Sequence, residues 1–342
     1  MVCEHREALQ DLPRGTFSAM SNTAPGFSRV AAVRGREVRA SLAALAAAAT
    51  VLGCSSAPAT PAPAPDASTP EADAGLADGA CPRFGTPTTL ATLEIAAIDE
   101  SSGLAASSLN AGVYWAHNDS GDTARAFAVS SEGKLLTTLS FDTAMPVDIE
   151  DMAIEDESPE RSFLYFGDIG DNGLVRKQLT IHRVAEPKVG AAMVTTPSEK
   201  MMVVYPDGAH NAETLLFDPI TKDLLIATKV KGGPSAIHRV GPFASGRTVT
   251  TEKIAEVAID LATGGEISRD GRYIGIRNYS PNAFLWVRAP GEGLAAALAR
   301  PPCKAPLANE LQGESLAFQL GNTGFVTISE GKNPELHVTP FE

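Results

Sequence analysis

One short sequence motif occurs five times along this chain at nearly regular intervals. In each copy, a small residue or a glutamate opens an apolar segment. The opening positions are separated by 48, 63, 52 and 49 residues, and they are Ser102, Glu150, Glu213, Gly265 and Glu314. A strand-rich repeat of about 50 residues is typical of the blades of a β-propeller. This period is the feature that most restricts the possible folds.

A second apolar run follows each opening segment and is bounded by turn-forming residues such as glycine, aspartate and asparagine. Short runs of this kind predict β-strands joined by tight turns. The five runs cover residues 113–116, 163–166, 224–227, 273–276 and 325–328. Helical periodicity is nearly absent, and residues 294–299 are the single helix candidate. We therefore predict an all-β fold that forms a single β-propeller.

The number of blades depends on how the two ends of the repeat region are interpreted. The last repeat has room for three strands before Glu342, and residues 88–95 predict a strand that belongs to no repeat. A five-bladed ring in which this N-terminal strand completes the last blade leaves no open sheet edge there, and we favour it. A six-bladed ring is the alternative, with an additional hairpin in the longer 150–213 interval.

The beginning of the chain predicts export. Four arginines precede an alanine- and leucine-rich run at residues 40–52, which is too short to span a bilayer and has the length of a signal-peptide core. The run ends in Val-Leu-Gly-Cys at residues 51–54 and resembles a bacterial lipoprotein signal. The resemblance implies that residues 1–53 are a signal peptide, and Met20 is an alternative start. It also implies that a lipid on Cys54 anchors the protein in the bacterial cell envelope, and Ser55 favours the outer membrane.

Composition divides the remainder of the chain into a tether and a folded domain. Residues 54–80 are rich in alanine and proline and contain no aromatic residue, so they cannot bury enough apolar surface to fold. Residues 81–342 form the predicted propeller domain. Removing residues 1–53 takes away six arginines and four acidic residues and changes the formal net charge from −13 to −15. This acidic balance, without a basic stripe, argues against nucleic-acid binding and suits cation binding. We expect a monomer.

Two cysteines, Cys81 and Cys303, belong to the predicted domain. An exported protein is exposed to an oxidising environment in which cysteines pair. Cys81 lies at the start of the domain and Cys303 shortly before the last repeat, so a disulfide between them would join the two ends of the ring.

The opening residues of the repeats predict a cation site. The innermost strands of a propeller run along its central channel, so equivalent residues face each other across it. Several carboxylates on one axis repel each other unless protons or a cation intervene. Oxygen ligands of this kind suit Ca²⁺. The predicted ligands are Ser102, Glu150, Glu213, Glu314 and, from the glycine–glutamate pair of the fourth repeat, Glu266. The alternative is that these acids are hydrated or paired with basic residues.

A second group of polar residues follows the second strand of each repeat and is expected at one common level. Asp168, Asp171, Lys229 and Arg277 are candidate catalytic residues, because two cations could hold a phosphate or carboxylate while the acids hold a metal or activate water. The candidate ligand-binding residues are Asn118, Asp119, Tyr279 and Glu330. Turn formation is the alternative role of the Asn-Asp-Ser-Gly and Gly-Asp-Asn-Gly type sequences found here.

Several of these motifs resemble those of exported bacterial propellers that include phytase-like and SdiA-regulated domains. The resemblance rests on Glu-Ser-Ser-Gly-Leu (100–104), His-Asn-Asp-Ser-Gly (117–121), Asp-Ile-Glu-Asp-Met-Ala (148–153) and Gln-Gly-Glu-Ser-Leu-Ala-Phe (312–318). The order of the ring residues is also similar to that of the calcium-activated apyrase propeller, which implies an axial Ca²⁺. The fourth ring position departs from that pattern, because Gly265 offers no side-chain ligand.

Three functions are compatible with this pattern. The first is a calcium-binding, membrane-anchored propeller that binds a small anionic ligand or an envelope component at its central pocket. The second is a calcium-dependent phosphoester hydrolase, which the family resemblance implies. The third is a structural envelope protein. We favour the first, since no nucleophile–base pair can be recognised in the sequence.

Overall fold

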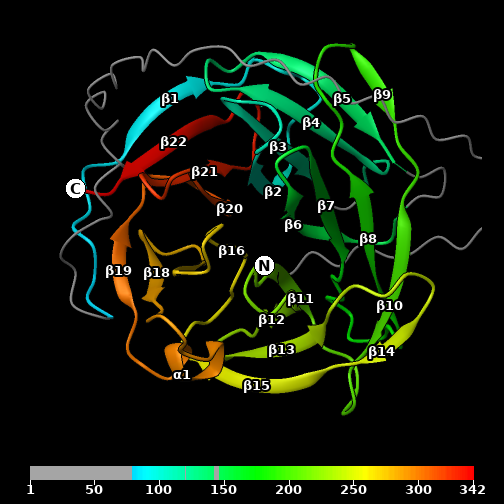
Figure 1. The fold of residues 1–342 in the computed structure, drawn as a ribbon, viewed down its shortest axis with the longest axis vertical. Helices are drawn as coiled ribbons and strands as arrows, with labels where there is room; N and C mark the ends of the chain where they lie inside the picture. Colours follow the sequence, from blue (N-terminus) through cyan, green and yellow to red (C-terminus); the bar gives the residue numbers. More distant parts are fainter. Residues whose placement is uncertain (1–78, 120, 142–145) are drawn as a thin grey trace, which may run out of the picture. The chain divides into compact units, whose positions relative to one another are not determined.

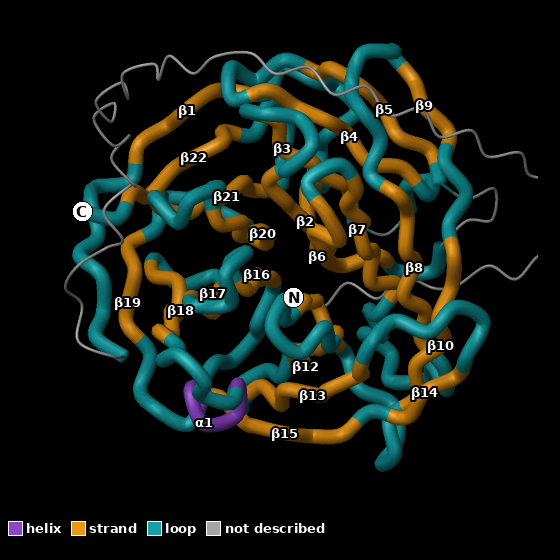
Figure 2. Tube along the Cα trace, in the orientation of Figure 1, coloured by secondary structure: helices purple, strands orange, loops and turns teal. Residues whose placement is uncertain are grey.

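The computed structural model describes residues 79–119, 121–141 and 146–342. The strands of these residues form five sheets, which stand around a common centre as the blades of a β-propeller (Figures 1 and 2). The prediction of an all-β propeller with five blades is therefore confirmed. The predicted signal peptide, Cys54 and nearly all of the predicted tether lie outside the described residues.

Blades 1 and 2 each contain five strands, of which the first lies innermost. Blade 1 consists of β2 (Ser101–Ala106), β3 (Val113–Asn118), β4 (Arg125–Ser130), β5 (Leu135–Ser140) and β9 (Met193–Thr195). Blade 2 consists of β6 (Ile149–Ser158), β7 (Arg161–Asp168), β8 (Leu179–Ala185), β10 (Glu199–Val204) and β14 (Thr248–Thr250). The long 150–213 interval thus contains β9, which pairs in parallel with β5 and extends blade 1. The described strands form no sixth sheet.

The other three blades contain four strands each. Blade 3 consists of β11 (Ala212–Phe217), β12 (Leu224–Thr228), β13 (Ser235–Gly241) and β15 (Glu252–Val257). Blade 4 consists of β16 (Gly264–Ile267), β17 (Tyr273–Arg277), β18 (Asn282–Val287) and β19 (Cys303–Pro306). Blade 5 consists of β20 (Gly313–Phe318), β21 (Gly324–Ser329), β22 (Glu335–Pro340) and β1 (Thr88–Thr92).

The two ends of the described domain meet in blade 5. β1 is the outer strand of this blade and pairs antiparallel with β22, the last strand of the chain. The innermost strands of neighbouring blades contact each other around the whole ring, from β2 through β6, β11, β16 and β20 back to β2. The expected helix is α1 (Leu294–Leu298), which packs against blades 3 and 4. Across the described residues, no helix has the length and apolar character needed to cross a membrane.

The hydrophobic core is divided among the spaces between the blades. Five buried clusters each combine side chains from two neighbouring blades. Between blades 1 and 2, for example, Trp115 packs in the same cluster as Phe166, and both side chains are fully buried. The second strand of each blade is covered on both faces, which explains why these strands read as continuous apolar runs in the sequence.

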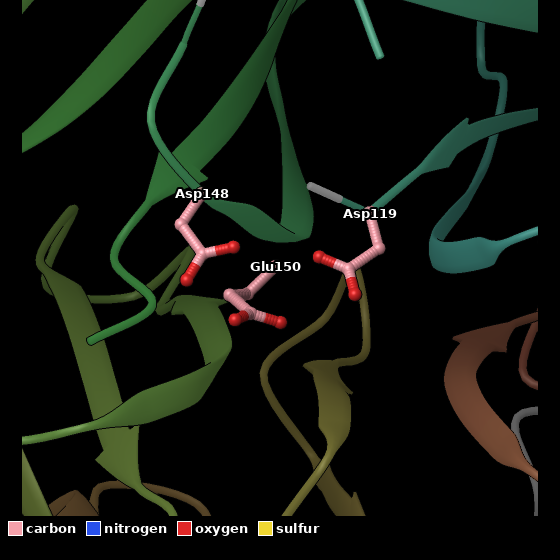
Figure 3. Close-up of side chains that lie close together, drawn as sticks. All are labelled: Asp119, Asp148 and Glu150. Carbon is pink, nitrogen blue, oxygen red and sulfur yellow. The ribbon is translucent and has the colours of Figure 1, made fainter. Parts of the chain in front are cut away.

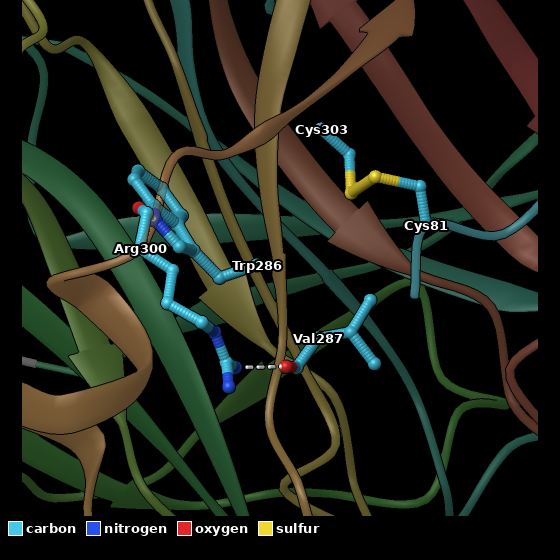
Figure 4. The surroundings of a disulfide bond; sticks show 5 residues. All are labelled: Cys81, Trp286, Val287, Arg300 and Cys303. Atoms are coloured by element: carbon cyan, nitrogen blue, oxygen red, sulfur yellow. Dashed lines mark hydrogen bonds between the residues drawn. A yellow bond between two sulfur atoms is a disulfide. The ribbon is translucent and has the colours of Figure 1, made fainter. Parts of the chain in front are cut away.

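A disulfide joins Cys81 to Cys303, with a Cα–Cα distance of 5.7 Å, as predicted (Figure 4). The two cysteines are 222 residues apart, so the bond links the segment before β1 to β19 of blade 4. Arg300 and Trp286 lie beside it, and the Trp286 indole donates a hydrogen bond to the Arg300 carbonyl at 2.8 Å. A bond that closes so long a loop stabilises the fold by restricting the unfolded chain, with a typical contribution of about 2–4 kcal/mol.

Candidate functional site

The predicted ring residues coincide with β-bulges in four of the five blades. Each bulge is an interruption of the pairing between the first and second strands, and one residue of the first strand is left without a partner. The unpartnered residues are Ser102 in β2, Glu150 in β6, Glu213 in β11 and Glu314 in β20. A bulge turns a side chain away from the regular alternation of a strand. The repeated bulge therefore explains why Glu150, Glu213 and Glu314, at the same position of three blades, present their side chains to the axis.

The three glutamates of this ring converge with carboxylates from the adjoining loops. Glu150 and Asp148 form a group with Asp119 in which the carboxylate oxygens lie within 4.8 Å of one another (Figure 3). Asp119 forms a second such group with Glu314 and Glu330. Glu213 lies close enough to Glu150 and Glu314 to influence their charges. We call these six residues the axial cluster: Asp119, Asp148, Glu150, Glu213, Glu314 and Glu330.

Three further side chains of this site come from one equivalent position, directly after the second strand of a blade. Asp119, Lys229 and Glu330 are the first residues after the second strands β3, β12 and β21. In each case the backbone N–H donates a hydrogen bond of 2.8–2.9 Å to the backbone carbonyl of the residue before the first strand of the same blade. The accepting carbonyls are those of Glu100, Asn211 and Gln312. Equivalent backbone pairing holds the three side chains at one level above the ring.

Blade 4 lacks the bulge, and the prediction that Glu266 belongs to the ring is not supported by its position. In β16, the residues from Gly264 to Ile267 pair with β17 without interruption. Glu266 is buried, pairs with Arg269 at 2.9 Å and accepts a hydrogen bond from the Phe318 backbone N–H of blade 5 at 2.5 Å. Glu266 therefore links blades 4 and 5 and does not join the axial cluster.

A hydrogen-bonded chain of side chains takes the place of the missing ring residue. The Lys229 ammonium group contacts the Glu213 carboxylate and lies 3.0 Å from the Tyr279 hydroxyl. The hydroxyl of Tyr279, from the loop after β17, donates to Glu314 at 2.6 Å. Glu213 and Glu314 flank blade 4, so Lys229 and Tyr279 complete the ring between them.

The pKa values of the cluster show how strongly its negative charges oppose each other. Burial, followed by the charges of Glu213 and Asp119, raises the pKa of Glu150 to about 11. Burial also raises the pKa of Glu213 to about 7, although Lys229 opposes the change. Burial and Glu314 raise the pKa of Glu330 to about 8. The cluster therefore holds protons near neutral pH unless another cation replaces them.

Arg277 and Asp168 do not join the cluster, because each is the last residue of a second strand. Arg277 is almost fully buried and forms an ion pair with Glu310 at 2.5 Å, between blades 4 and 5. Asp168 accepts hydrogen bonds from the backbone N–H groups of Val147 and Asp148, at 3.1 and 3.0 Å. Asp168 also pairs with Arg176 at 2.8 Å. It holds the segment that leads to Asp148 and so positions a cluster residue.

Asp171, Asn118 and Ser102 also have structural contacts. Asp171 accepts hydrogen bonds from the backbone of residues 175 and 176 and so stabilises a turn. The Asn118 amide donates to the Ala97 carbonyl at 2.8 Å and to Asp122 at 2.9 Å. The Ser102 hydroxyl donates to the main-chain oxygen of Glu150, which links blades 1 and 2 next to the ring. For Asp171 the turn interpretation fits better than the predicted catalytic role, and for Asn118 it fits better than the predicted ligand-binding role.

Two acidic residues that were not among the predicted site residues contribute to the site. Asp148 is a full member of the axial cluster, two residues before Glu150. Asp151 is buried and accepts hydrogen bonds from the backbone N–H groups of Met152, Leu215 and Gly265, at 2.8, 2.9 and 3.3 Å. One carboxylate thus joins blades 2, 3 and 4 beneath the ring. Three of the four residues at 148–151 are acidic, and this dense motif was the feature of the sequence that could have indicated both Asp148 and Asp151.

Comparison with known proteins gives little further information. No protein-family model matches the chain, and no curated protein matches it. Among solved structures, the glutaminyl cyclase of Myxococcus xanthus is similar with a TM-score of 0.42 and 10% sequence identity, over 75% of this chain and 97% of that one. We base no functional argument on a similarity of this size.

Proposed function

We propose that this protein is a calcium-binding β-propeller that holds a ligand at its axial site. The observation that carries the proposal is the convergence of six carboxylates on one axis beside the ammonium group of Lys229. Both groups of three that share Asp119 consist of aspartate and glutamate alone. Such oxygen donors suit Ca²⁺ better than metals that prefer histidine or cysteine.

The irregular arrangement of these oxygen donors also suits Ca²⁺. Calcium takes about six to eight oxygen ligands at 2.3–2.6 Å and tolerates irregular geometry. Asp119 and Asp148 lie on loops, whereas Glu150 is fixed by its bulge. A bound Ca²⁺ would offset the repulsion among these carboxylates and polarise oxygen atoms that complete its coordination. A ligand with a carboxylate or phosphate oxygen fits such a position, which is the basis for expecting a small anionic ligand.

The second part of the proposal concerns location. We propose that Cys54 carries a lipid and that residues 54–80 act as a tether between the bacterial envelope and the propeller. Its support is the lipoprotein-like sequence before Cys54 and the proline-rich composition after it. Mass spectrometry of the membrane fraction tests this directly, because Cys54→Ala should remove the lipid and release the protein.

The hydrolase alternative has lost part of its basis. The sequence suggested that Lys229 and Arg277 together hold a phosphate. Arg277 is buried in an ion pair with Glu310, and Lys229 already contacts Glu213. We therefore favour binding over phosphoester hydrolysis, and over a purely structural role because the mouth of the cluster is partly open at Asp119 and Glu330.

Thermal unfolding with Ca²⁺ and with a chelator tests the proposed function. Free Ca²⁺ at about a hundred times its dissociation constant should stabilise the fold by about 2.7 kcal/mol. Release of phosphate from a panel of phosphoesters, measured with Lys229→Ala as the control, separates binding from hydrolysis. Calcium-dependent release that the variant abolishes would favour the hydrolase. Equal melting curves in calcium and chelator would exclude the axial cation.

A further inference from the structure

The loop between β7 and β8 lies directly against two carboxylates of the axial cluster. Gly170 in this loop is buried, and a Cβ atom at this position would overlap one carboxylate oxygen each of Asp148 and Glu150. Figure 3 shows these two carboxylates close together, beside that of Asp119. The backbone of Gly170 does not have a positive φ angle, so the position needs glycine for its lack of a side chain and not for its conformation. Gly170 therefore leaves the space that both carboxylates occupy.

Arg176, from the same loop, connects Gly170 to the segment that carries Asp148. Its guanidinium group donates to the Gly170 carbonyl at 2.7 Å and pairs with the Asp168 carboxylate at 2.8 Å. Asp168 accepts hydrogen bonds from the backbone N–H groups of Val147 and Asp148. The Gly170 N–H donates to the Asp148 carbonyl at 3.3 Å. One guanidinium group thus holds both segments that lie around the Asp148 side chain, which requires the fixed fork of an arginine.

Asp148 and Glu150 differ in their partners from the opposite side of the cluster. No arginine, lysine or histidine among the described residues forms an ion pair with either carboxylate. By contrast, Glu213 contacts the Lys229 ammonium group, and Glu314 accepts a hydrogen bond from a tyrosine hydroxyl. The protein therefore compensates the first pair of carboxylates less, and a cation bound there depends on how closely the two are held together.

We propose that Gly170 and Arg176 position the carboxylates that bind calcium at the axial site, an inference that rests on the calcium binding proposed above. Gly170 leaves room for Asp148 and Glu150 on one side of the ion, and Arg176 keeps the Asp148 carboxylate directed toward it. Neither residue is a ligand, and each acts through the carboxylates. The loop between β7 and β8 therefore sets the affinity for Ca²⁺ together with the innermost strands.

A matched pair of glycine variants tests the role of Gly170, by calorimetric titration of Ca²⁺ into the metal-free protein. Gly170→Ala should weaken binding by at least about ten-fold, because the added methyl group displaces the carboxylates of Asp148 and Glu150. Only the ends of two side chains have to move, so the fold is retained, and melting curves in chelator establish this. Gly173→Ala is the control in the same loop. Its Cβ atom would lie 3.7 Å from Val175, an ordinary contact, and the affinity should stay within about two-fold.

Arg176→Gln tests the role of the arginine, and the direction of its effect is informative. Loss of a positive charge near a cation site by itself favours cation binding, whereas loss of a positioning contact weakens it. We expect Arg176→Gln to weaken Ca²⁺ binding by about ten-fold. Lys177→Gln removes an exposed charge from the same loop and should leave the affinity within about two-fold. In a protein that already carries Asp148→Ala, Arg176→Gln should change the affinity by no more than about two-fold, because the side chain that it positions is gone.

The outcomes separate this inference from the proposed function. If the native protein binds no Ca²⁺, both are overturned. If the native protein binds Ca²⁺ but Gly170→Ala binds it as well as Gly173→Ala does, or Arg176→Gln binds it more tightly, the inference alone is overturned. Equal weakening by Arg176→Gln with and without Asp148→Ala would mean that Arg176 does not act through Asp148, and would also overturn the inference.

Discussion

Blades 2 and 4 contain the same antiparallel arrangement of inner strands and differ by one residue. In blade 2, a bulge between Ile149 and Asp151 leaves Glu150 outside the regular pairing and presents it to the axis. In blade 4 the pairing of β16 with β17 is continuous, and Glu266 points to Arg269 and blade 5 instead. A single inserted residue thus decides whether a glutamate of the innermost strand becomes a candidate metal ligand or a link between blades. This follows from the two-residue period of a strand.

The same shift of one residue separates the two cations that the sequence analysis grouped together. Arg277 ends β17 and lies between the blades, whereas Lys229 follows the end of β12 and reaches the axial cluster. Arg277→Met should lower the free energy of unfolding by about 3–5 kcal/mol, because Glu310 is left buried without its partner. Denaturant unfolding of this variant measures the loss.

Lys229→Met provides the control for that experiment. Glu213 can take up a proton when Lys229 is removed, since its pKa is already about 7. We expect a smaller loss than in Arg277→Met, about 1 kcal/mol, because a protonated Glu213 leaves no unpaired buried charge. If Arg277→Met and Lys229→Met lowered the free energy of unfolding equally, the different positions of the two residues relative to the strand end would have no energetic consequence.

The two glutamates should also differ in stability when the metal is removed. Glu266→Gln should destabilise the metal-free protein by about 2 kcal/mol, because Arg269 loses a buried partner. Glu150→Gln should leave it equally stable or more stable, since burial and like charges already oppose ionisation at that position. Urea unfolding in chelator compares them, and a larger loss from Glu150→Gln would contradict this description of the cluster.

The dependence of stability on pH sharpens the comparison further. In the folded, metal-free protein, the pKa values of Glu213 and Glu330 are raised to about 7 and about 8, from 4.5 in the unfolded chain. The folded state then binds more protons, so the contribution of these two groups to stability is fully present below pH 4.5 and is lost as the pH rises through 7 and 8. Glu330 is partly exposed and screened by solvent, so we count mainly Glu213 and expect a decrease of roughly 2 kcal/mol between pH 5 and pH 8 in chelator. Unfolding curves across this range measure it, and a rise in stability over the same range would be inconsistent with the cluster.

The repeat period was sufficient to predict the propeller, because five copies of one strand pattern leave few alternative architectures. The ring residues Glu150, Glu213 and Glu314 could also be found, since they occupy the same position in the repeat. The bulges could not, because nothing in the sequence of Gly265 and Glu266 distinguishes an uninterrupted strand from one with an inserted residue. For the same reason Arg277 and Lys229 looked equivalent, although the end of a strand separates their environments.

The Cys81–Cys303 disulfide is a different case. Its prediction needed only two cysteines and an oxidising environment, and it did not depend on the exact register of any strand. Features of the whole ring were therefore more accessible from the sequence than features set by a single residue.

Calorimetric titration of Ca²⁺ into the metal-free protein tests the central claim most directly, with Glu150→Gln and Glu266→Gln measured beside the native chain. If the bulged residues form a cation site, the native protein binds Ca²⁺, Glu150→Gln weakens binding by at least about ten-fold, and Glu266→Gln leaves the affinity within about two-fold. Absence of binding in the native protein, or equal weakening in the two variants, would contradict an axial site built from bulged residues.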